Sequence, residues 1–346
     1  MSRRKKNSGE VTIIDVAREA NVSYSTVSRV VNNKEYVKPE TRRRVVQAMS
    51  RLGYQVNMQA RSLAGGRSNV IGLLVVDLTT QYMGEIMRGI DDVLAANQYE
   101  LMLYTTHRRK TKESTYVNMM ARGLADGLLI VLPRNTDEYL ESLRTRDFPY
   151  VLIDQTSVDE SDLTVYSSNQ QGGYEATKHL IELGHRRIGI ISGWMDMISA
   201  KDRLEGYKAA LADHNIPLNP ELIFEGDFTQ SSGYSGATRF LHMEERPTAV
   251  FASNDVQAMG VIEATRACGL HVPKDLSVIG FDDIPMAALS NPQLTTVHQP
   301  LQEMGKLATQ MLLESINNSE EKVKKSTSKI LPTELIIRET TAPPKC

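Results

Sequence analysis

From Val70 onward, short apolar segments alternate with amphipathic ones, and few folds satisfy that pattern. A parallel sheet covered by helices on both faces does, because its strands are buried on both sides and read as near-continuous apolar runs. The apolar runs fall into two sets of four. They are Val70–Val76, Glu100–Tyr104, Gly127–Val131 and Tyr150–Ile153, then Arg187–Ile191, Leu222–Glu225, Ala249–Ala252 and Leu276–Gly280. We therefore expect an α/β core with two groups of parallel strands.

The two sets resemble each other. The first opens with VIGLLVV and the helical GEIMRGIDDVLAANQ, and the second with RIGIISG and DRLEGYKAALADHN. Two doubly wound lobes of this kind bind ligands in a cleft at the carboxyl ends of their strands. We expect the core over residues 70–341, with a first lobe of about 70–167 plus 298–325 and a second of about 168–297 plus 326–341. Thr296–Leu313 should cross back to the first lobe, and Ile330–Arg338 should form the last strand.

Composition argues against several classes of protein. A chain of 346 residues suits two or three domains, and it holds no apolar run of about 18 residues that could span a membrane. The basic start MSRRKKNSGE lacks the apolar segment of a secretory signal. Cys268, Cys346 and the seven histidines show no metal-ligand spacing. A reduced, cytoplasmic location is therefore expected.

Charge is divided unevenly along the chain. Residues 1–69 hold 14 Lys and Arg against 5 Asp and Glu, whereas the remaining residues hold 26 against 37. A basic front on an acidic body indicates a polyanionic partner for the front alone. The alternative is an uneven distribution of solvated charges without a partner.

The front divides into three parts. Residues 1–10 are polar and basic and should form a disordered arm, and residues 11–56 read as three short helices. The helix ends are marked by Thr12, by Ser23 after a turn at Asn21 and Val22, and by Pro39 and Gly53. Residues 57–69 form a linker, NMQARSLAGGRSN, that could make about two helical turns, which is marginal in water alone.

A helix, a tight turn and a second helix are the geometry of a helix-turn-helix, whose second helix enters the DNA major groove. The outer face of this second helix carries hydrogen-bonding side chains, which are Tyr24, Ser25, Ser28 and Arg29. Arg can pair with guanine in the groove, and the others can reach base edges or phosphates. Basic residues placed for phosphate contacts are Arg18, Lys34, Arg42, Arg43 and Arg44. The alternative is a three-helix bundle that docks on another protein.

Polar side chains at the predicted strand ends suit a ligand rich in hydroxyl groups. They are Asp154 after VLI, Asn254 after VFAS, Asp282 after VIGF, and Arg203 at the start of the helix after Arg187–Ile191. A polyol needs carboxylates to accept and Arg or Asn to donate, with an aromatic ring against its apolar faces. Arg203 could instead form a structural ion pair between the lobes, and Asp255 and Asp283 could cap helices. No nucleophile–base pair, metal cluster or phosphate loop is present, so neither catalysis nor a cofactor is expected.

The chain resembles the lactose-repressor/galactose-repressor family of bacterial transcriptional regulators from Val11 to Thr341, in the family's order and spacing. The matching segments are VTIIDVAREANVSYSTVSRVVNNKEYVKPETRRRVVQAMSRLGYQVN, ARSLAGGRSNVIGLLV, LGHRRIGIISG, DRLEGYKAAL, VFASNDVQAMGVIEA, VPKDLSVIGFDD, PQLTTVHQP and LPTELIIRET. Val56 departs from the pattern, because family members usually carry proline there. The resemblance implies a helix-turn-helix head on a core like that of periplasmic binding proteins, and a repressor that binds a palindromic operator as a homodimer.

For DNA binding, the resemblance implies that Tyr24, Ser25 and Arg29 contact bases. It also implies that Ala60–Leu63 forms a hinge helix in the minor groove, where Leu63 wedges into a base step, although a linker leucine can also pack on the core. The full set expected to contact DNA is Thr12, Ser23, Tyr24, Ser25, Thr26, Ser28, Arg29, Asn32, Asn57, Ala60, Arg61 and Leu63.

For effector binding, the resemblance implies that five positions contact the ligand, namely Asp154, Arg203, Asn254, Asp282 and Gln299. Phe228 matches a position that is often aromatic in sugar-binding members, and Tyr82, Met83 and Asp77 would line the first-lobe side. Trp194, the only tryptophan, either stacks on the ligand or simply packs. The expected effector is a mono- or disaccharide, with a nucleobase or another small metabolite as alternatives, and we expect it to release the DNA.

Two other classes of protein share parts of this pattern. A sugar receptor of periplasmic type has the two-lobed core but carries a signal peptide and no helix-turn-helix. An α/β enzyme would need the catalytic groups that the sequence lacks. A DNA-binding regulator is the hypothesis that accounts for both the basic front and the two-lobed core.

Overall fold

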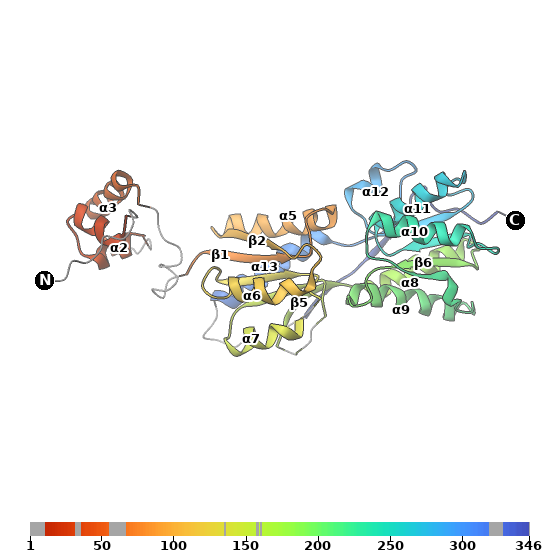
Figure 1. The fold of residues 1–346 in the computed structure, drawn as a ribbon, viewed down its shortest axis with the longest axis horizontal. Coiled ribbons are helices and arrows are strands. Elements are labelled where there is room, and N and C mark those ends of the chain that lie inside the picture. Colours follow the sequence, from red (N-terminus) through yellow and green to blue (C-terminus); the bar gives the residue numbers. More distant parts are fainter. Residues whose placement is uncertain are drawn as a thin grey trace. The chain divides into compact units, whose positions relative to one another are not determined.

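The computed structural model describes residues 11–31, 36–54, 67–134, 136–156, 159, 161–317 and 328–345. The chain separates into two compact units, Met1–Ser68 and Asn69–Cys346. Figure 1 shows the helices and strands of both units.

The first unit contains α1 (Ile13–Glu19), α2 (Tyr24–Val31) and α3 (Pro39–Leu52). Thr12 caps α1 in a capping box with Asp15, because each side chain bonds the backbone N–H of the other residue. Ser23 Oγ accepts from the Thr26 N–H at 3.2 Å at the start of α2. Gly53 ends α3 with a φ of 63°, a left-handed conformation that glycine adopts without steric cost.

The apolar faces of these three helices form a common core. Val16, Val27 and Val45 come from one helix each and are fully buried, and Ala17, Ala20, Val30 and Ala48 complete the cluster. Burying these faces compensates for helices that are too short to be stable alone. The helix ends expected at Thr12, Ser23, Pro39 and Gly53 are thus found in the structure.

The first lobe of the second unit is a six-stranded parallel sheet in the order β11-β5-β4-β3-β1-β2. Its strands are β1 (Val70–Val75), β2 (Glu100–Thr105), β3 (Gly127–Val131), β4 (Tyr150–Ile153), β5 (Leu163–Ser167) and β11 (Ser328–Leu331). One apolar cluster joins the sheet to α5 (Gln81–Ala96) and α13 (Leu301–Asn317). A second cluster joins it to α6 (Glu113–Met120) and α7 (Leu140–Thr145), so both faces are covered (Figure 1).

The second lobe repeats this arrangement in the order β12-β10-β9-β8-β6-β7, with only β12 antiparallel. Its strands are β6 (Ile188–Ser192), β7 (Ile223–Glu225), β8 (Ala249–Ala252), β9 (Ser277–Asp282), β10 (Thr295–His298) and β12 (Glu334–Ile336). Two apolar clusters again cover the two faces. The covering helices are α8 (Asn169–Glu182), α9 (Ile198–Asp213), α10 (Gln230–Leu241) and α11 (Asp255–Ala267), and the short α12 (Pro285–Leu289) follows β9.

Both α/β lobes expected from the sequence are present, but three details differ. Strands β5 and β10 are not among the predicted runs, and Thr296–His298 belongs to a strand of the second sheet before the chain crosses back. The predicted last strand, Ile330–Arg338, is divided: β11 pairs with β5 in the first lobe, and β12 pairs with β10 in the second. The proline at position 332 interrupts strand pairing between them.

The order of the strands identifies where a ligand should lie. In each lobe the strand order reverses between the first and third strands, at β1/β3 and at β6/β8. In open α/β sheets, ligands bind outside the carboxyl ends of the strands at this switch point. None of the helices in the described ranges is both long and apolar enough to cross a membrane.

Candidate functional site

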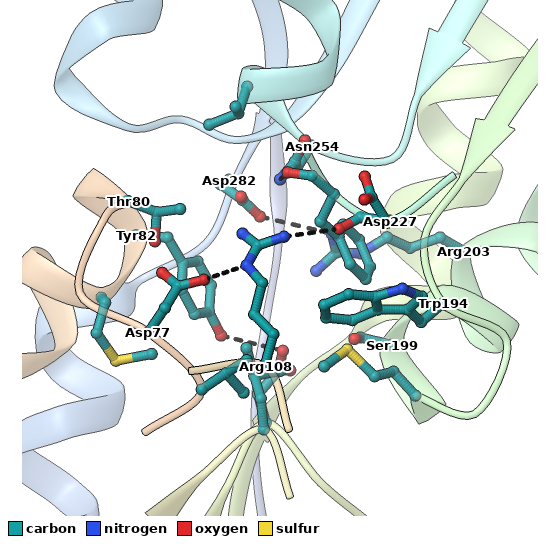
Figure 2. A pocket seen from close by; sticks show the side chains of 17 residues that line it. Asp77, Thr80, Tyr82, Arg108, Trp194, Ser199, Arg203, Asp227, Asn254 and Asp282 are labelled. Carbon is teal, nitrogen blue, oxygen red and sulfur yellow. Dashed lines mark hydrogen bonds and ion pairs between the residues drawn. The ribbon is translucent and has the colours of Figure 1, made fainter. Parts of the chain in front are cut away.

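A cavity with an empty volume of about 600 Å³, part of it open to solvent, lies at the carboxyl ends of the strands of both lobes (Figure 2). From the first lobe it is lined by Val76, Asp77, Thr80, Tyr82, Met83, Arg108, Leu132 and Asp154. From the second it is lined by Trp194, Met197, Ser199, Arg203, Asp227, Phe228, Asn254, Val256 and Asp282.

A chain of buried polar side chains forms one wall of the cavity. Tyr82 donates its hydroxyl to Asp154 Oδ2 at 3.0 Å, and Asn169 Nδ2 donates to Asp154 Oδ1 at 3.2 Å. Arg203 Nε donates to Asn169 Oδ1 at 2.8 Å, and its Nη1 donates to the Ser253 carbonyl at 2.5 Å. Since these groups satisfy one another, they are held in fixed orientations beside the cavity.

Asp282 ends β9 and completes this network. Its Oδ1 lies 3.5 Å from Arg203 Nη1 and accepts from Gln299 Nε2 at 2.7 Å. Burial raises the pKa of Asp282 to about 7, although Arg203 and Gln299 favour its charged form. Asp282 is thus a carboxyl group that can either accept or donate a hydrogen bond near neutral pH.

Arg108 follows β2 and lies in the middle of the cavity in Figure 2. Its Nε donates to Asp77 Oδ2 at 2.6 Å, and its Nη1 reaches the Asp227 carbonyl of the second lobe at 3.5 Å. Burial alone would raise the pKa of Asp77, but hydrogen bonds from Thr79 and the charge of Arg108 lower it below its usual value. Asp77 is therefore a carboxylate at neutral pH.

Several residues around the cavity have left-handed backbones, which side chains with a Cβ rarely adopt. They are Arg108, Leu132, Asp154, Phe228 and Asp282, with φ values of 63°, 51°, 57°, 64° and 112°. Such conformations persist where the surrounding structure enforces them, and they are common at ligand sites. The strand ends are thus shaped to turn side chains toward the cavity.

Aromatic and apolar groups line the rest of the cavity. Phe228 and Trp194 come from the second lobe, and Tyr82 comes from the first. The Arg203 guanidinium lies 3.8 Å from the ring centre of Phe281 and 6.0 Å from that of Phe228. Aromatic faces beside carboxylates and guanidinium groups are what a polyol with apolar C–H faces requires.

Nine of the ten residues expected at the effector site line this cavity. They are Asp77, Tyr82, Met83, Asp154, Trp194, Arg203, Phe228, Asn254 and Asp282. Gln299 does not: it is 1 % exposed, and it lies behind Asp282, accepting from Ser167 and donating to the Asp282 carboxyl. That any of them binds an effector stays a prediction.

The structure also shows which partners Arg203, Asp255 and Asp283 have at the strand ends. Arg203 pairs with Asp282 inside the second lobe rather than across the lobes. Asn254, rather than Asp255, caps α11, accepting from the Gln257 N–H at 2.8 Å. Asp255 is buried and accepts from Thr296 and from the Ile284 N–H, and Asp283 pairs with Arg338 at 2.6 Å. Neither of these two carboxylates lines the cavity.

Sequence reasoning missed several residues that line the cavity, chiefly Arg108, Asp227, Thr80 and Ser199. Asp227 immediately precedes Phe228, and Arg108 follows the end of β2, so the strand-end rule that located Asp154 applies to both. The basic run HRRKTK hid Arg108, because its sequence looks like an ordinary solvated loop.

The head presents a separate polar face on α2. Tyr24, Ser25 and Arg29 are exposed, with Tyr24 at 53 %, while Thr26 and Ser28 are half-buried. The Ser23 hydroxyl lies 2.9 Å from those of Ser25 and Thr26, and Thr12 is exposed at the start of α1. Asn32, Lys34, Asn57, Ala60, Arg61 and Leu63 lie outside the described residues.

In the part of the chain that the structure describes, no group of three or more His, Cys, Asp or Glu side chains could hold a metal ion. The buried His185 has a structural role: its ring contacts Thr248 and Ser277, and Nε2 lies 2.9 Å from the Ala342 carbonyl. An exposed polar helix face and a two-lobed cleft together define a ligand-binding regulator with a helix-turn-helix.

Comparison with known proteins identifies the family of regulators to which the chain is similar. The sequence model of the bacterial regulatory proteins of the lacI family matches residues 12–57, and that of the periplasmic binding protein-like domain matches residues 177–341. The HTH-type transcriptional repressor PurR of Aliivibrio salmonicida (strain LFI1238) is 37 % identical over 308 residues, which are 89 % of this chain and 92 % of that protein.

Two solved structures are similar over 96 % of this chain and the whole of the other. The lac repressor dimer bound to operator and the anti-inducer ONPF is 29 % identical with a TM-score of 0.82. The complex of the transcriptional regulator CelR with cellobiose is 30 % identical with a TM-score of 0.72. The chain belongs to the lacI family and is a DNA-binding transcriptional repressor, not an enzyme.

Proposed function

We propose that this repressor binds a palindromic operator as a homodimer and that a sugar in the cleft of its core releases it from the DNA. The observation that carries the sugar assignment is the lining of the cleft. There Asp154, Asp282, Arg203 and Asn254 surround a cavity of about 600 Å³ beside the aromatic ring of Phe228. Such a set matches the paired donors, acceptors and apolar faces of a mono- or disaccharide.

The DNA assignment is supported by the exposed face of α2. In a helix-turn-helix this face enters the major groove, where Arg29 can pair with guanine and Tyr24 and Ser25 can reach neighbouring groups. A homodimer would read two half-sites about one helical turn apart, which makes its operator a pseudo-palindrome. The lac repressor relative was solved as a dimer on its operator.

Coupling between the two sites would pass through the linker of residues 57–69. A hinge helix at Ala60–Leu63 would be ordered only on the minor groove beside its partner, so a change in the spacing of the two cores would melt it. Asn57, Arg61 and Leu63 are the linker residues proposed to contact DNA. Function of this kind places the protein in the cytoplasm on the nucleoid.

Thermal-shift screening of the full chain tests the sugar assignment, because a ligand that binds the folded state raises its melting temperature. The panel contains mono- and disaccharides, cellobiose among them, together with purine bases. A shift with a sugar, reduced in Asp282→Asn and in Arg203→Lys, is the expected result. A shift with a purine base alone would replace the sugar by a nucleobase.

A matched control for these substitutions is Arg338→Lys. Arg338 pairs with Asp283 next to the site but does not line the cavity. The variant should therefore respond to the sugar as the parent does. If it lost the response to the same extent as the two site variants, the loss would reflect general destabilisation, and the cleft assignment would fail.

A further inference from the structure

A cluster of charged residues joins the two lobes at one edge of the cleft. Arg134, in the loop after β3 of the first lobe, donates from Nε and Nη2 to Asp196 Oδ1 and from Nη2 to Oδ2, at 3.2, 3.0 and 2.7 Å. Asp196 lies in the loop between β6 and α9 of the second lobe, and Lys110 Nζ of the first lobe is 3.8 Å from it. The contact is a forked arginine–carboxylate pair, the strongest geometry for such an interaction.

Trp194 lies against this pair on the side of the cavity. The Arg134 guanidinium is 4.0 Å from the centre of the Trp194 ring, and that of Arg108 is 5.3 Å away. Trp194 and Arg108 line the cavity, whereas Arg134 and Asp196 do not. The pair therefore stands behind the indole rather than in contact with a bound ligand.

Arg134 is itself held in place. Its backbone N–H lies 3.1 Å from both carboxylate oxygens of Glu113, a buried residue that also accepts from the hydroxyl of the buried Tyr139 at 3.2 Å. The Arg134 side chain is 11 % exposed and that of Asp196 is 35 % exposed. An arginine whose loop is already fixed loses less conformational freedom when it forms an ion pair.

We propose that Arg134 and Asp196 are a positioning pair for the effector cleft: they clasp the lobes across its mouth, fix Trp194 as a wall of the cavity, and slow the exit of the effector. This inference rests on the proposed sugar site for its last part only. The clasp and the position of Trp194 are properties of the ligand-free protein.

The expected size of the effect follows from the geometry. An exposed ion pair contributes little, but a forked pair with one side chain largely buried and a guanidinium stacked on an indole contributes more. Breaking the clasp should raise the dissociation rate of the effector by about 5- to 30-fold, the range that a pair and a cation–π contact of this kind give together.

Quenching of tryptophan fluorescence by acrylamide tests the clasp in the full chain, because Trp194 is the only tryptophan. Arg134→Ala and Asp196→Asn should each raise the quenching constant of the ligand-free protein, and high salt should raise that of the parent because salt screens exposed charges. The reversed pair, Arg134→Asp with Asp196→Arg, should restore part of the protection. Arg187→Ala is the control, since Arg187 pairs with Glu245 within the second lobe.

If the quenching constants of both single variants equalled that of the parent, the clasp would be overturned. The same holds if the Arg187→Ala control raised the quenching constant as much as the two single variants do. The effect on effector exit is tested by stopped-flow dissociation of the sugar that most stabilises the parent in the thermal-shift panel. Raised quenching with an unchanged dissociation rate would overturn the effect on effector exit. If the parent binds no sugar, the proposed function fails before any variant is compared, whereas the quenching result still decides the clasp.

Discussion

At the scale of single residues, Asp282 is a buried carboxyl group whose charge depends on its surroundings. The residue is 3 % exposed, its carboxyl lies between Arg203 and Gln299, and burial raises its pKa to about 7. In the unfolded chain the same group has a pKa near 3.8. Between these two values the folded protein binds a proton that the unfolded chain has released.

The sign of the resulting pH dependence is fixed. Because the folded pKa is the higher one, the contribution of Asp282 to stability is fully present below pH 3.8 and is lost as the pH rises to about 7. Asp282→Asn removes this titration. Relative to the parent, its free energy of unfolding should therefore improve by about 2 kcal/mol between pH 5 and pH 7, since one proton contributes about 1.4 kcal/mol per pH unit.

Urea denaturation followed by Trp194 emission measures this difference at each pH. Burial and the charge of Asp282 raise the pKa of Asp255, so the difference between variant and parent reports the joint titration of these two neighbouring carboxyl groups. A difference between variant and parent that stays constant from pH 5 to pH 8 would show that Asp282 is already ionised in the folded core.

Arg29 is the residue on which sequence-specific binding should depend most. It is exposed on α2, and its guanidinium can pair with a guanine, so Arg29→Ala should weaken operator binding by about 1–3 kcal/mol. Arg43→Ala, on the exposed side of α3, is the matched control. It should weaken binding to operator and to random DNA alike and reduce the salt slope.

Fluorescence anisotropy with labelled duplexes at several salt concentrations compares the two variants. The assignment of α2 as the recognition helix requires that Arg29→Ala lose discrimination and that Arg43→Ala keep it. The reverse pattern would assign the readout to another surface.

At the scale of elements, local signals in the sequence located most helices and strands. The ends of α3 follow from Pro39 and Gly53, and β3, β4 and β8 coincide with predicted runs because each is apolar along its whole length. Strands β5 (LTVYS) and β10 (TTVH) do not stand out in the sequence, because threonine, serine and histidine side chains interrupt their apolar runs. These strands are recognisable only once their neighbours in the sheet are known.

The candidate site shows the same limit. Asp154, Asn254 and Asp282 follow directly from the rule that ligands bind beyond parallel strands, because each residue ends or follows an apolar run. Arg108 could not be chosen from a run of basic residues, since its role depends on Asp77 and Asp227, which the fold brings to it from 31 and 119 residues away. Gln299 was expected to line the cavity but lies behind Asp282. Its position depends on hydrogen bonds with Asp282 and Ser167, which the sequence alone does not show.

Helices α5 and α13 pack closely against each other in the first lobe. The two helices touch at glycines: a Cβ on Gly89 would lie 2.0 Å from the Gln302 carbonyl oxygen, and one on Gly305 would lie 2.2 Å from that of Ile86. Because backbone cannot move aside as a side chain can, Gly89→Ala should destabilise the core by about 1–3 kcal/mol or more.

Gly84→Ala, on the same helix, is the control, because a Cβ there would meet no atom within 4 Å. It should stabilise the core by about 0.5–1 kcal/mol through the higher helix propensity of alanine. Urea midpoints followed by Trp194 emission compare the two variants. Equal and small effects would mean that the helices are not packed at these glycines.

At the scale of the whole molecule, charge and ligand chemistry are divided between the two units. The basic front suits phosphates, whereas the cleft of the acidic core holds its charged groups in internal pairs such as Arg203 with Asp282. The two binding events therefore make different contacts, and any influence of one on the other must come from a change in the equilibrium between states of the protein.

That requirement yields a quantitative prediction. If the sugar weakens operator binding by a given factor, the operator must weaken sugar binding by the same factor. The reason is that the two orders of binding are two routes around one thermodynamic cycle of four states. Couplings of this kind are about 1–3 kcal/mol, or roughly 5- to 150-fold. Operator anisotropy with and without saturating sugar gives one factor, and titration of Trp194 emission with sugar, with and without operator, gives the other.

A duplex of scrambled sequence is the control for the second titration, since it should leave the sugar affinity nearly unchanged. Leu63→Ala, in the proposed hinge helix, should bring both factors toward one together, because it removes the contact that distinguishes operator from other DNA. Two factors that disagree beyond error would contradict a single linked equilibrium. If both factors were one in the parent, the cleft and the head would be independent binding sites, and the proposed release of DNA by the sugar would be wrong.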